Sequence, residues 1–476
     1  MRAQQAGKAI GLARSDSTRS RLSGSSVRAR IGAALAAFFL FASAVQPAKA
    51  EGLIRDAEIE DTLRVWGEPL WEAAGLQPED VSIYILDDPS INAFVAGGQN
   101  IFMHTGLLMA ANRPNEIIGV MAHETGHISG GHSLRRREAM RESMGPAWIS
   151  IGLGVLLVAA GAPDAGAALI SSSGNFAMGN LVRHTQAEEA SADQAAVGFL
   201  EATDQSGEGL ITFFNREFRP YEYLTRRAPP YLVTHPYPSD RVEALRRRVA
   251  AQPHYEAVDS DDYMRRFRFM QAKLVGFITP LSQTLATYPE SDTSQPARYA
   301  RAVAYYRVSD LDSARAELDL LVAEDPNNAY FQELYGQILF ENNRAEEAIG
   351  YYRRSVELAP EEPLLIIGLA RALVAGQGRE GADEAIRLLQ HAVSLEPDNA
   401  FAWRELASAR ELRGERGLAE LASAEQNYSV GNYPLALNFA ERARRNLSEG
   451  TVAYQRALDI TNFASSELRE RQTQRQ

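Results

Sequence analysis

Residues 115–127 read NEIIGVMAHETGH, and the prediction of a fold for the first half of the chain rests on this stretch. Ile117, Ile118 and Val120 make this stretch apolar, and Asn115 and Glu116 are typical of a helix start. His123 and His127 are four residues apart, so on a helix both imidazoles project from one face and can bind one Zn²⁺. Glu124 is offset from them and is placed to act as general base on a water molecule at that ion.

Two histidines need a third ligand, and the sequence offers more than one candidate. Residues 187–193 read AEEASAD and open a helix on which Glu189 and Asp193 share one face. We expect Glu189 to be the ligand, with Glu188 as the alternative. We expect Asp193 to accept a hydrogen bond from a ligating imidazole. Without the histidine pair, the same acids would be read as a solvated helix start.

His132 is the histidine nearest to the pair, but its spacing argues against a ligand role. At about 100° per residue it would lie on the far side of a continued helix from His123. A third ligand of the metzincin type would fall at residue 133, which is Ser133 here. We therefore expect His132 to be structural or to support a ligand.

Three strands are predicted before this helix, over 81–86, 92–96 and 100–104. Gly97 and Gly98 form a tight turn between the last two. The strand 92–96 is either a sheet edge that aligns a substrate backbone by strand addition or one arm of a plain hairpin.

The second half of the chain contains a helical repeat. Pro326 and Pro360 are 34 residues apart, and Pro397 follows after 37. In that register one position is always small (Ala302, Gly336, Ala370), a second is always alanine (Ala314, Ala348, Ala385), and a third is large (Leu318, Tyr352, Leu389). This pattern resembles the tetratricopeptide repeat. Looser units follow around Trp403 and Ala436, and such arrays bind peptides or protein partners on a concave face.

Charge and composition exclude several classes of function. Residues 1–50 carry eight basic residues and one acidic residue, which leaves 41 basic and 60 acidic residues, a net of −19, for the rest of the 476-residue chain. A body this acidic argues against a nucleic-acid partner. The absence of cysteine excludes disulfides, thiolate metal sites and cysteine nucleophiles.

Two apolar segments bear on location. Residues 1–50 combine a basic region, an apolar run from Ile31 to Val45 and a small-residue exit at Ala48-Lys49-Ala50. These features predict a signal peptide and export to the periplasm, with a retained membrane anchor as the alternative. The apolar run 147–160 is short for a membrane span. We expect a helical hairpin over the active site that touches the membrane surface or a substrate; a membrane-anchored protease is the alternative.

The motifs together resemble the HtpX-like and BepA-like zinc metallopeptidases. The resemblance rests on HETGH, on the E-x-x-A-D of residues 189–193, on the segment from Thr234-His235-Pro236 to Arg241, and on the repeats that follow. It implies that His123, His127 and Glu189 bind one Zn²⁺ and that Glu124 is the general base. It implies that His235 is an additional ligand holding the enzyme latent; the residue alone also allows an oxyanion donor or a structural loop histidine. Where such proteins often have E-x-E-A-D, this chain has Ser191.

We therefore expect a mostly α protein in three parts after the leader. An α+β zincin-like metallopeptidase domain with a small β-sheet spans 51–255, a tetratricopeptide-repeat α-solenoid spans 257–465, and a frayed tail spans 466–476. The expected function is that of a periplasmic zinc endopeptidase in outer-membrane protein assembly and quality control. Its repeats would bind outer-membrane proteins or their assembly machinery. A non-proteolytic chaperone with a latent zinc site is the alternative.

Overall fold

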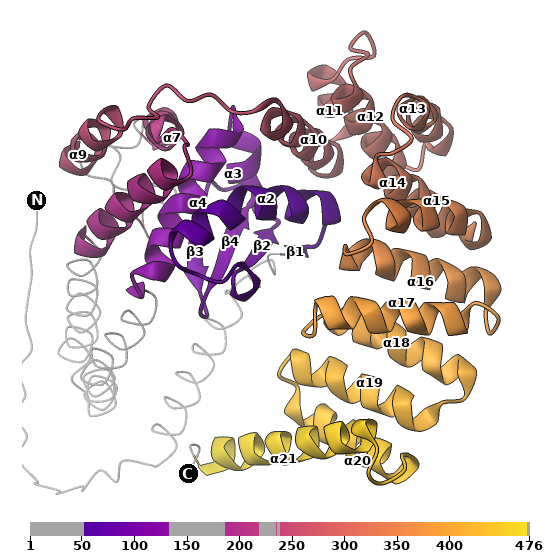
Figure 1. Ribbon diagram of the computed structural model, residues 1–476. Coiled ribbons are helices and arrows are strands. Elements are labelled where there is room, and N and C mark those ends of the chain that lie inside the picture. Colours follow the sequence, from indigo (N-terminus) through magenta and orange to yellow (C-terminus); the bar gives the residue numbers. More distant parts are fainter. Residues whose placement is uncertain (1–51, 133–185, 219–234, 236–238, 474–476) are drawn as a thin grey trace, which may run out of the picture. The chain divides into compact units, whose positions relative to one another are not determined.

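In the described part of the chain, four strands form one small sheet in the order β1-β2-β4-β3 (Figure 1). Their bounds are Leu53–Ile54 for β1, Ser82–Leu86 for β2, Ala93–Ala96 for β3 and Asn100–His104 for β4. β2 and β4 are parallel, whereas β1 and β3 run antiparallel to their neighbours. Gly97 and Gly98 turn the chain between β3 and β4 with φ of 67° and 115°, values that favour glycine. Of the strands that the structure describes, β3 is the outermost on its side of the sheet.

This is a computed structural model, and it describes residues 52–132, 186–218, 235 and 239–473. The predicted signal peptide over 1–50 and the apolar run 147–160 lie outside these residues. In the part described, no helix combines the length and the apolar character that crossing a membrane requires.

Helices pack against the sheet and against one another in the first domain. They are α2 (Ala57–Ala73), the 3₁₀ turn η1 (Pro78–Asp80), α3 (Thr105–Ala110), α4 (Pro114–Ser129), a helix over 186–202, α7 (Glu208–Phe218) and α9 (Ser239–Ala250). Trp66 and Trp71 of α2 are fully buried in the same core as Ile117 and Ile118 of α4. α4 contacts α2, α7 and β3, which fixes it in the middle of the domain.

The repeats begin after α10 (Asp261–Ile278) and α11 (Leu281–Thr287). The pairs are α12 (Gln295–Arg307) with α13 (Leu311–Glu324), α14 (Ala329–Glu341) with α15 (Ala345–Leu358), α16 (Pro363–Gln377) with α17 (Ala382–Leu395), α18 (Ala400–Arg413) with α19 (Arg416–Ser429), and α20 (Tyr433–Asn446) with α21 (Val452–Thr473). Figure 1 shows these pairs stacked one after another. Residues Leu53–Gln476 form one compact unit.

The repeat register of the sequence is seen directly in the packing. Gly336 needs to be small because an added Cβ would lie 2.9 Å from the ring of Tyr352. Each of the three prolines follows the end of a second helix by two residues. α21 continues to Thr473, and near its end the guanidinium of Arg471 lies over the ring of Tyr433 at 4.8 Å. The frayed tail over 466–476 stays a prediction.

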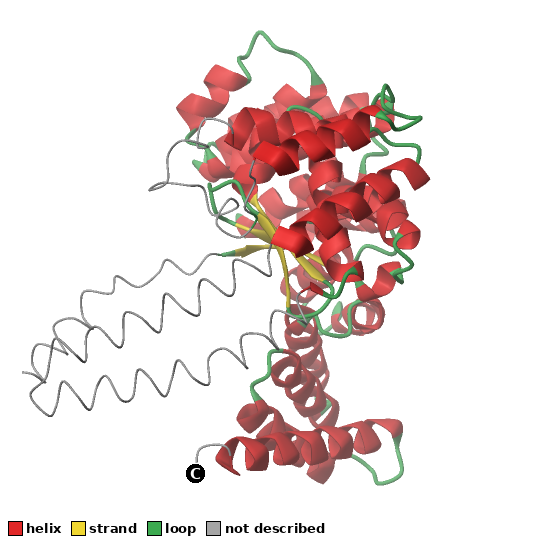
Figure 2. Cartoon of the chain, turned by 90° about the vertical axis from the view of Figure 1, so that its left-hand side faces the viewer, coloured by secondary structure: helices red, strands yellow, loops and turns green. Residues whose placement is uncertain are grey.

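The predicted fold class is confirmed. The protein is mostly helical, and among the described residues Figure 2 shows strands in a single small sheet only.

Candidate metal centre

Helix α4 places three residues of the site in the interior of the domain. Pro114 occupies its first turn, where a missing N–H costs nothing, and every residue from Pro114 to His127 is buried. His123 and Glu124 have no exposed surface, and His127 is only 3% exposed. The helix ends at Ser129, where Gly130 and Gly131 follow.

The helix over 186–202 lies directly against α4 and brings Glu189 to the histidine pair. Gly126 makes this approach possible, because a Cβ there would lie 2.7 Å from the carbonyl oxygen of Ala192. Glu189 is fully buried, whereas Glu188, the alternative ligand, is partly exposed. The choice between these two acids therefore favours Glu189.

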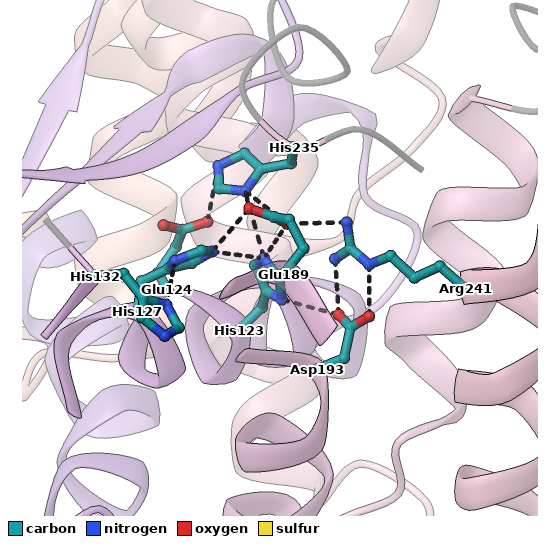
Figure 3. Close-up of polar contacts among 8 residues, drawn as sticks. All are labelled: His123, Glu124, His127, His132, Glu189, Asp193, His235 and Arg241. Carbon is teal, nitrogen blue, oxygen red and sulfur yellow. Dashed lines mark hydrogen bonds and ion pairs between the residues drawn. The ribbon is translucent and has the colours of Figure 1, made fainter. Parts of the chain in front are cut away.

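Four donor side chains converge on one point, and Figure 3 shows them pointing toward one another. Ligand atoms of His123, His127, Glu189 and His235 all lie within 4.8 Å of one another, and all four residues are buried. The Nε2 atoms of His123 and His127 are 3.1 Å apart. Each lies 3.3 Å from an oxygen of Glu189.

These separations fit a zinc ion. A tetrahedral Zn²⁺ with ligands at about 2.0–2.1 Å requires ligand atoms about 3.4 Å from one another. Three nitrogen donors and one carboxylate are a donor set that zinc accepts. The Nε2 atoms of His123 and His127 are so close that their lone pairs would repel each other unless a proton or a cation lies between them.

A second layer of side chains holds both imidazoles by their other nitrogen. Nδ1 of His123 lies 3.1 Å from Oδ1 of Asp193. Nδ1 of His127 lies 2.9 Å from Nδ1 of His132, which turns back after the glycines that end α4. Because each Nδ1 is engaged in this layer, each Nε2 is directed at the donor cluster.

Arg241 of α9 is the residue of the site whose role we did not predict. Its guanidinium contacts Oε2 of Glu189 at 2.8 Å and both oxygens of Asp193 at 2.5 and 2.8 Å. One side chain thus fixes the carboxylate in the donor cluster and the carboxylate behind it. The only hint in the sequence was its position at the end of the segment that starts at Thr234.

The electrostatics keep Glu189 ionised and one imidazole neutral. Burial opposes the charge of Glu189, but hydrogen bonds with His123, His127 and His235 hold the pKa of its carboxyl far below the usual range. Burial lowers the pKa of His127 to about 3, against the effect of Glu189. Burial also opposes charge on His123, yet Asp193 and Glu189 raise its pKa to about 9.

Asp193 is held ionised by its own partners. Burial would raise the pKa of this carboxyl, but the hydrogen bonds with Arg241 and His123 lower it to about 2.

His235 is part of the donor cluster and also faces Glu124. Its Nδ1 lies 2.9 Å from Oε1 of Glu189 and 3.4 Å from Nε2 of His123. Its Nε2 lies 3.7 Å from Oε1 of Glu124. The side chain therefore stands between the proposed ligands and the proposed general base.

Comparison with known proteins gives the same two-part organisation. Residues 57–249 match the model of peptidase family M48, and residues 299–363 match a tetratricopeptide-repeat model. The beta-barrel assembly-enhancing protease of Yersinia pestis is 26% identical over 407 residues, covering 84% of this chain and 82% of the relative. Its namesake in Escherichia coli K12 is 26% identical over 405 residues, with the same coverage. The chain has the architecture of the beta-barrel assembly-enhancing proteases.

A shorter relative matches the first domain. Metalloprotease LoiP of Escherichia coli K12 is 28% identical over 181 residues, which cover 37% of this chain and 64% of that protein. The resemblance to BepA-like metallopeptidases is confirmed, and the M48 match together with the names of the relatives supports a metalloprotease. The exact domain boundaries and the roles of the site residues stay predictions.

Proposed function

We propose that this chain is a periplasmic zinc endopeptidase that acts in the assembly and quality control of outer-membrane proteins. The observation that carries the proposal is the buried cluster of His123, His127, Glu189 and His235, with Glu124 beside it. One Zn²⁺ per chain would be held by His123, His127 and Glu189. When bound, the ion supplies Lewis acidity that makes a water nucleophilic near neutral pH.

The residues of the chain supply the proton transfers and the orientation. Glu124 accepts the proton of the attacking water and returns it to the leaving amine. Asp193 and Arg241 keep His123 and Glu189 in place, so that little reorganisation is needed during the reaction.

The edge strand offers a way to align the substrate. Among the described residues β3 pairs with β4 on one side and is the last strand of the sheet, so its other edge could pair with an extended peptide. A substrate strand paired with β3 would be held extended, so that its amide bonds would be evenly spaced along the edge of the domain that contains the site.

Metal analysis and proteolysis on the same preparations test this proposal. The mature protein should contain one zinc per chain and digest casein or an outer-membrane barrel precursor. His123→Ala and Glu189→Ala should lose both zinc and activity. Glu124→Gln should keep zinc and lose cleavage; a Glu124→Gln protein that still cleaves would refute the assignment of the base.

The position of His235 leads to a separate prediction. Because its Nδ1 lies among the proposed ligand atoms, we expect His235 to act as a latch that occupies the open position of the site. His235→Ala should then retain zinc and digest casein faster than the parent. Slower digestion with zinc retained would make the residue an oxyanion donor instead, and an unchanged rate would remove it from the mechanism.

Export and partners complete the proposal. The leader over 1–50 would direct the chain to the periplasm, and the segment 147–160 would touch the membrane surface or a barrel substrate. The repeats would bind outer-membrane proteins or their assembly machinery, because the relatives are named for beta-barrel assembly.

A non-proteolytic chaperone is the second candidate, and the contacts of His235 favour it. A site whose fourth position is filled would leave the repeats as the working part of the protein. A deletion phenotype that Glu124→Gln rescues fully in cells supports the chaperone. Failure to rescue supports the protease.

A further inference from the structure

A cavity of about 600 Å³ lies between the start of the first domain and the repeats. Residues 54–57 and Ile59 form one wall, and the opposite wall comes from the first helices of successive repeats. α14 contacts α16, and α16 contacts α18, so these first helices line the inner side of the array. Apolar side chains dominate the lining, among them Ile54, Phe277, Leu364 and Phe401.

The charged groups at this cavity are out of balance. Glu333 of α14 lines it with a side chain that is 20% exposed. Among the described residues, its ion-pair partner is Lys273, at 4.0 Å. That ammonium is engaged more closely by Asp56 at 2.8 Å and Glu58 at 3.5 Å. The buried Lys273 is thus the shared ion-pair partner of three carboxylates, so the carboxylates outnumber the cation in this cluster.

The ionisation of Glu333 shows the same deficit of positive charge. Burial raises the pKa of its carboxyl to about 7, and the negative charges of Asp56 and Glu58 add to this against the effect of Lys273. A second cation beside Glu333 would relieve the repulsion.

The arginines at the cavity do not supply that cation. Arg55 is committed to Glu60 at 2.9 Å and to Glu396 at 2.9 Å. Arg307 is exposed and donates to the carbonyl oxygen of Thr279 at 3.1 Å. The inner part of the cavity therefore stays apolar and acidic.

We propose that this cavity binds an extended segment of a partner protein in which an apolar side chain stands next to a lysine or arginine. The apolar side chain would fill the space among Phe277, Leu364 and Phe401, and the basic one would pair with Glu333. A segment with an acidic neighbour would be repelled by the same carboxylates. This inference rests on the proposed function only in taking the repeats as the protein-binding part.

Fluorescence anisotropy on the full mature chain tests the proposal. The protein carries Glu124→Gln, so binding is measured without cleavage and independently of the metal-site chemistry. The probe is a short, end-blocked, labelled peptide with one phenylalanine followed by one lysine in a Gly/Ser background. The matched peptide has glutamate in place of the lysine. We expect the lysine peptide to bind at least about tenfold more tightly than the glutamate peptide.

Two further variants locate the binding. Glu333→Gln should weaken the lysine peptide about tenfold, whereas Glu357→Gln, a 55% exposed acid on α15, should leave its affinity unchanged. Gln337→Lys places a lysine one turn after Glu333 on the same cavity wall, and this i, i+4 pairing also favours the helix. Because the new lysine would pair with Glu333 in place of the lysine of the peptide, this variant should also weaken binding. Equal binding of both peptides, or unchanged affinity in both cavity variants, would overturn the proposal.

Discussion

At the scale of single residues, metal binding depends on which ring nitrogen of each histidine faces the donor cluster and which one is held by a neighbouring side chain. Asp193 contacts Nδ1 of His123, and His132 contacts Nδ1 of His127. The carboxylate contact favours the tautomer of His123 that presents an Nε2 lone pair to the donor cluster, whereas the imidazole contact of His127 is compatible with either tautomer, because either ring nitrogen can be the donor. Of the two, only the carboxylate of Asp193 also adds negative charge behind a ligand.

We predict that Asp193→Asn lowers zinc affinity about 10–100-fold. The amide oxygen can still accept a hydrogen bond from His123, but the charge is lost and Arg241 loses a bidentate partner. Competition with a chelator of known affinity measures the change. Asp204→Asn is the matched control, because the side chain of Asp204 is 82% exposed and its positive φ of 56° suits asparagine. Equal affinity in Asp193→Asn and the control would contradict a role for this carboxylate.

The sequence could point to some of these residues and not to others. Glu189 and Asp193 could be predicted because helical spacing puts them on one face of a helix and because the HETGH motif calls for a further metal ligand. Arg241 comes from a different helix, 48 positions after Asp193, and no local periodicity links the two. The angle of His132 on a continued helix predicts a structural or supporting role, but α4 ends at Ser129, and the contact of His132 with His127 depends on how the glycines bend the chain.

At the scale of elements, the site is made where two helices touch. α4 supplies the histidines, the helix over 186–202 supplies Glu189, and Gly126 allows the two backbones to approach. An added methyl group would overlap the carbonyl oxygen and Cα of Ala192, at 2.7 and 2.9 Å, and neither atom belongs to a flexible side chain.

We predict that Gly126→Ala destabilises the protein by about 1–3 kcal/mol and weakens zinc binding, although alanine is the better helix former. The helices must separate to admit the methyl group, and the separation moves Glu189 away from the histidines. Gly198→Ala, in the same helix as Glu189, is the control. Nothing lies within 4 Å of its added Cβ, so it should be neutral or stabilising by up to about 1 kcal/mol. Urea unfolding and zinc titration measure both effects; a neutral Gly126→Ala would show that this contact does not set the site.

Elements with a strong local pattern were predictable, and elements made by distant partners were not. The three main strands, the HETGH helix and the registered repeats follow from periodicity and turn residues. β1 has two residues and exists because Leu53 and Ile54 pair with Leu86 and Ile85. The contact of Arg471, near the end of α21, with the ring of Tyr433 likewise joins two helices that no local pattern links.

At the scale of the whole molecule, a short segment joins the two halves of the chain. Arg55 pairs with Glu396, the hydroxyl of Tyr299 donates to Glu58 at 2.8 Å, and the hydroxyl of Tyr330 donates to Asp61 at 3.0 Å. These partners lie 241–341 positions apart in sequence, so no sequence pattern could indicate them. Several carboxylates lie close together at this joint between residues 55–61 and the repeats. Its stability should therefore depend on pH, because these groups repel one another when they are ionised.

Glu362 should report that dependence. Burial raises the pKa of its carboxyl to about 8, and the negative charges of Glu60, Asp61 and Glu396 add to the effect. Its pKa is therefore higher in the folded than in the unfolded chain, where it is about 4.5. Below the unfolded value both states are protonated, and the group costs nothing. Between pH 4.5 and about 8, Glu362 stays protonated in the folded chain but is ionised in the unfolded chain. The unfolded chain therefore binds fewer protons, and the free energy of unfolding falls as the pH rises through this range.

We predict that Glu362→Gln, which cannot ionise, matches the parent in stability near pH 4. It should become more stable than the parent as pH rises, by on the order of 2 kcal/mol above pH 8, since solvent screens a partly exposed side chain. Urea unfolding at a series of pH values measures the divergence. Glu361→Gln, at a neighbouring position whose side chain is 71% exposed, should run parallel to the parent throughout. If Glu362→Gln also runs parallel, the crowded carboxylates at the joint do not limit its stability.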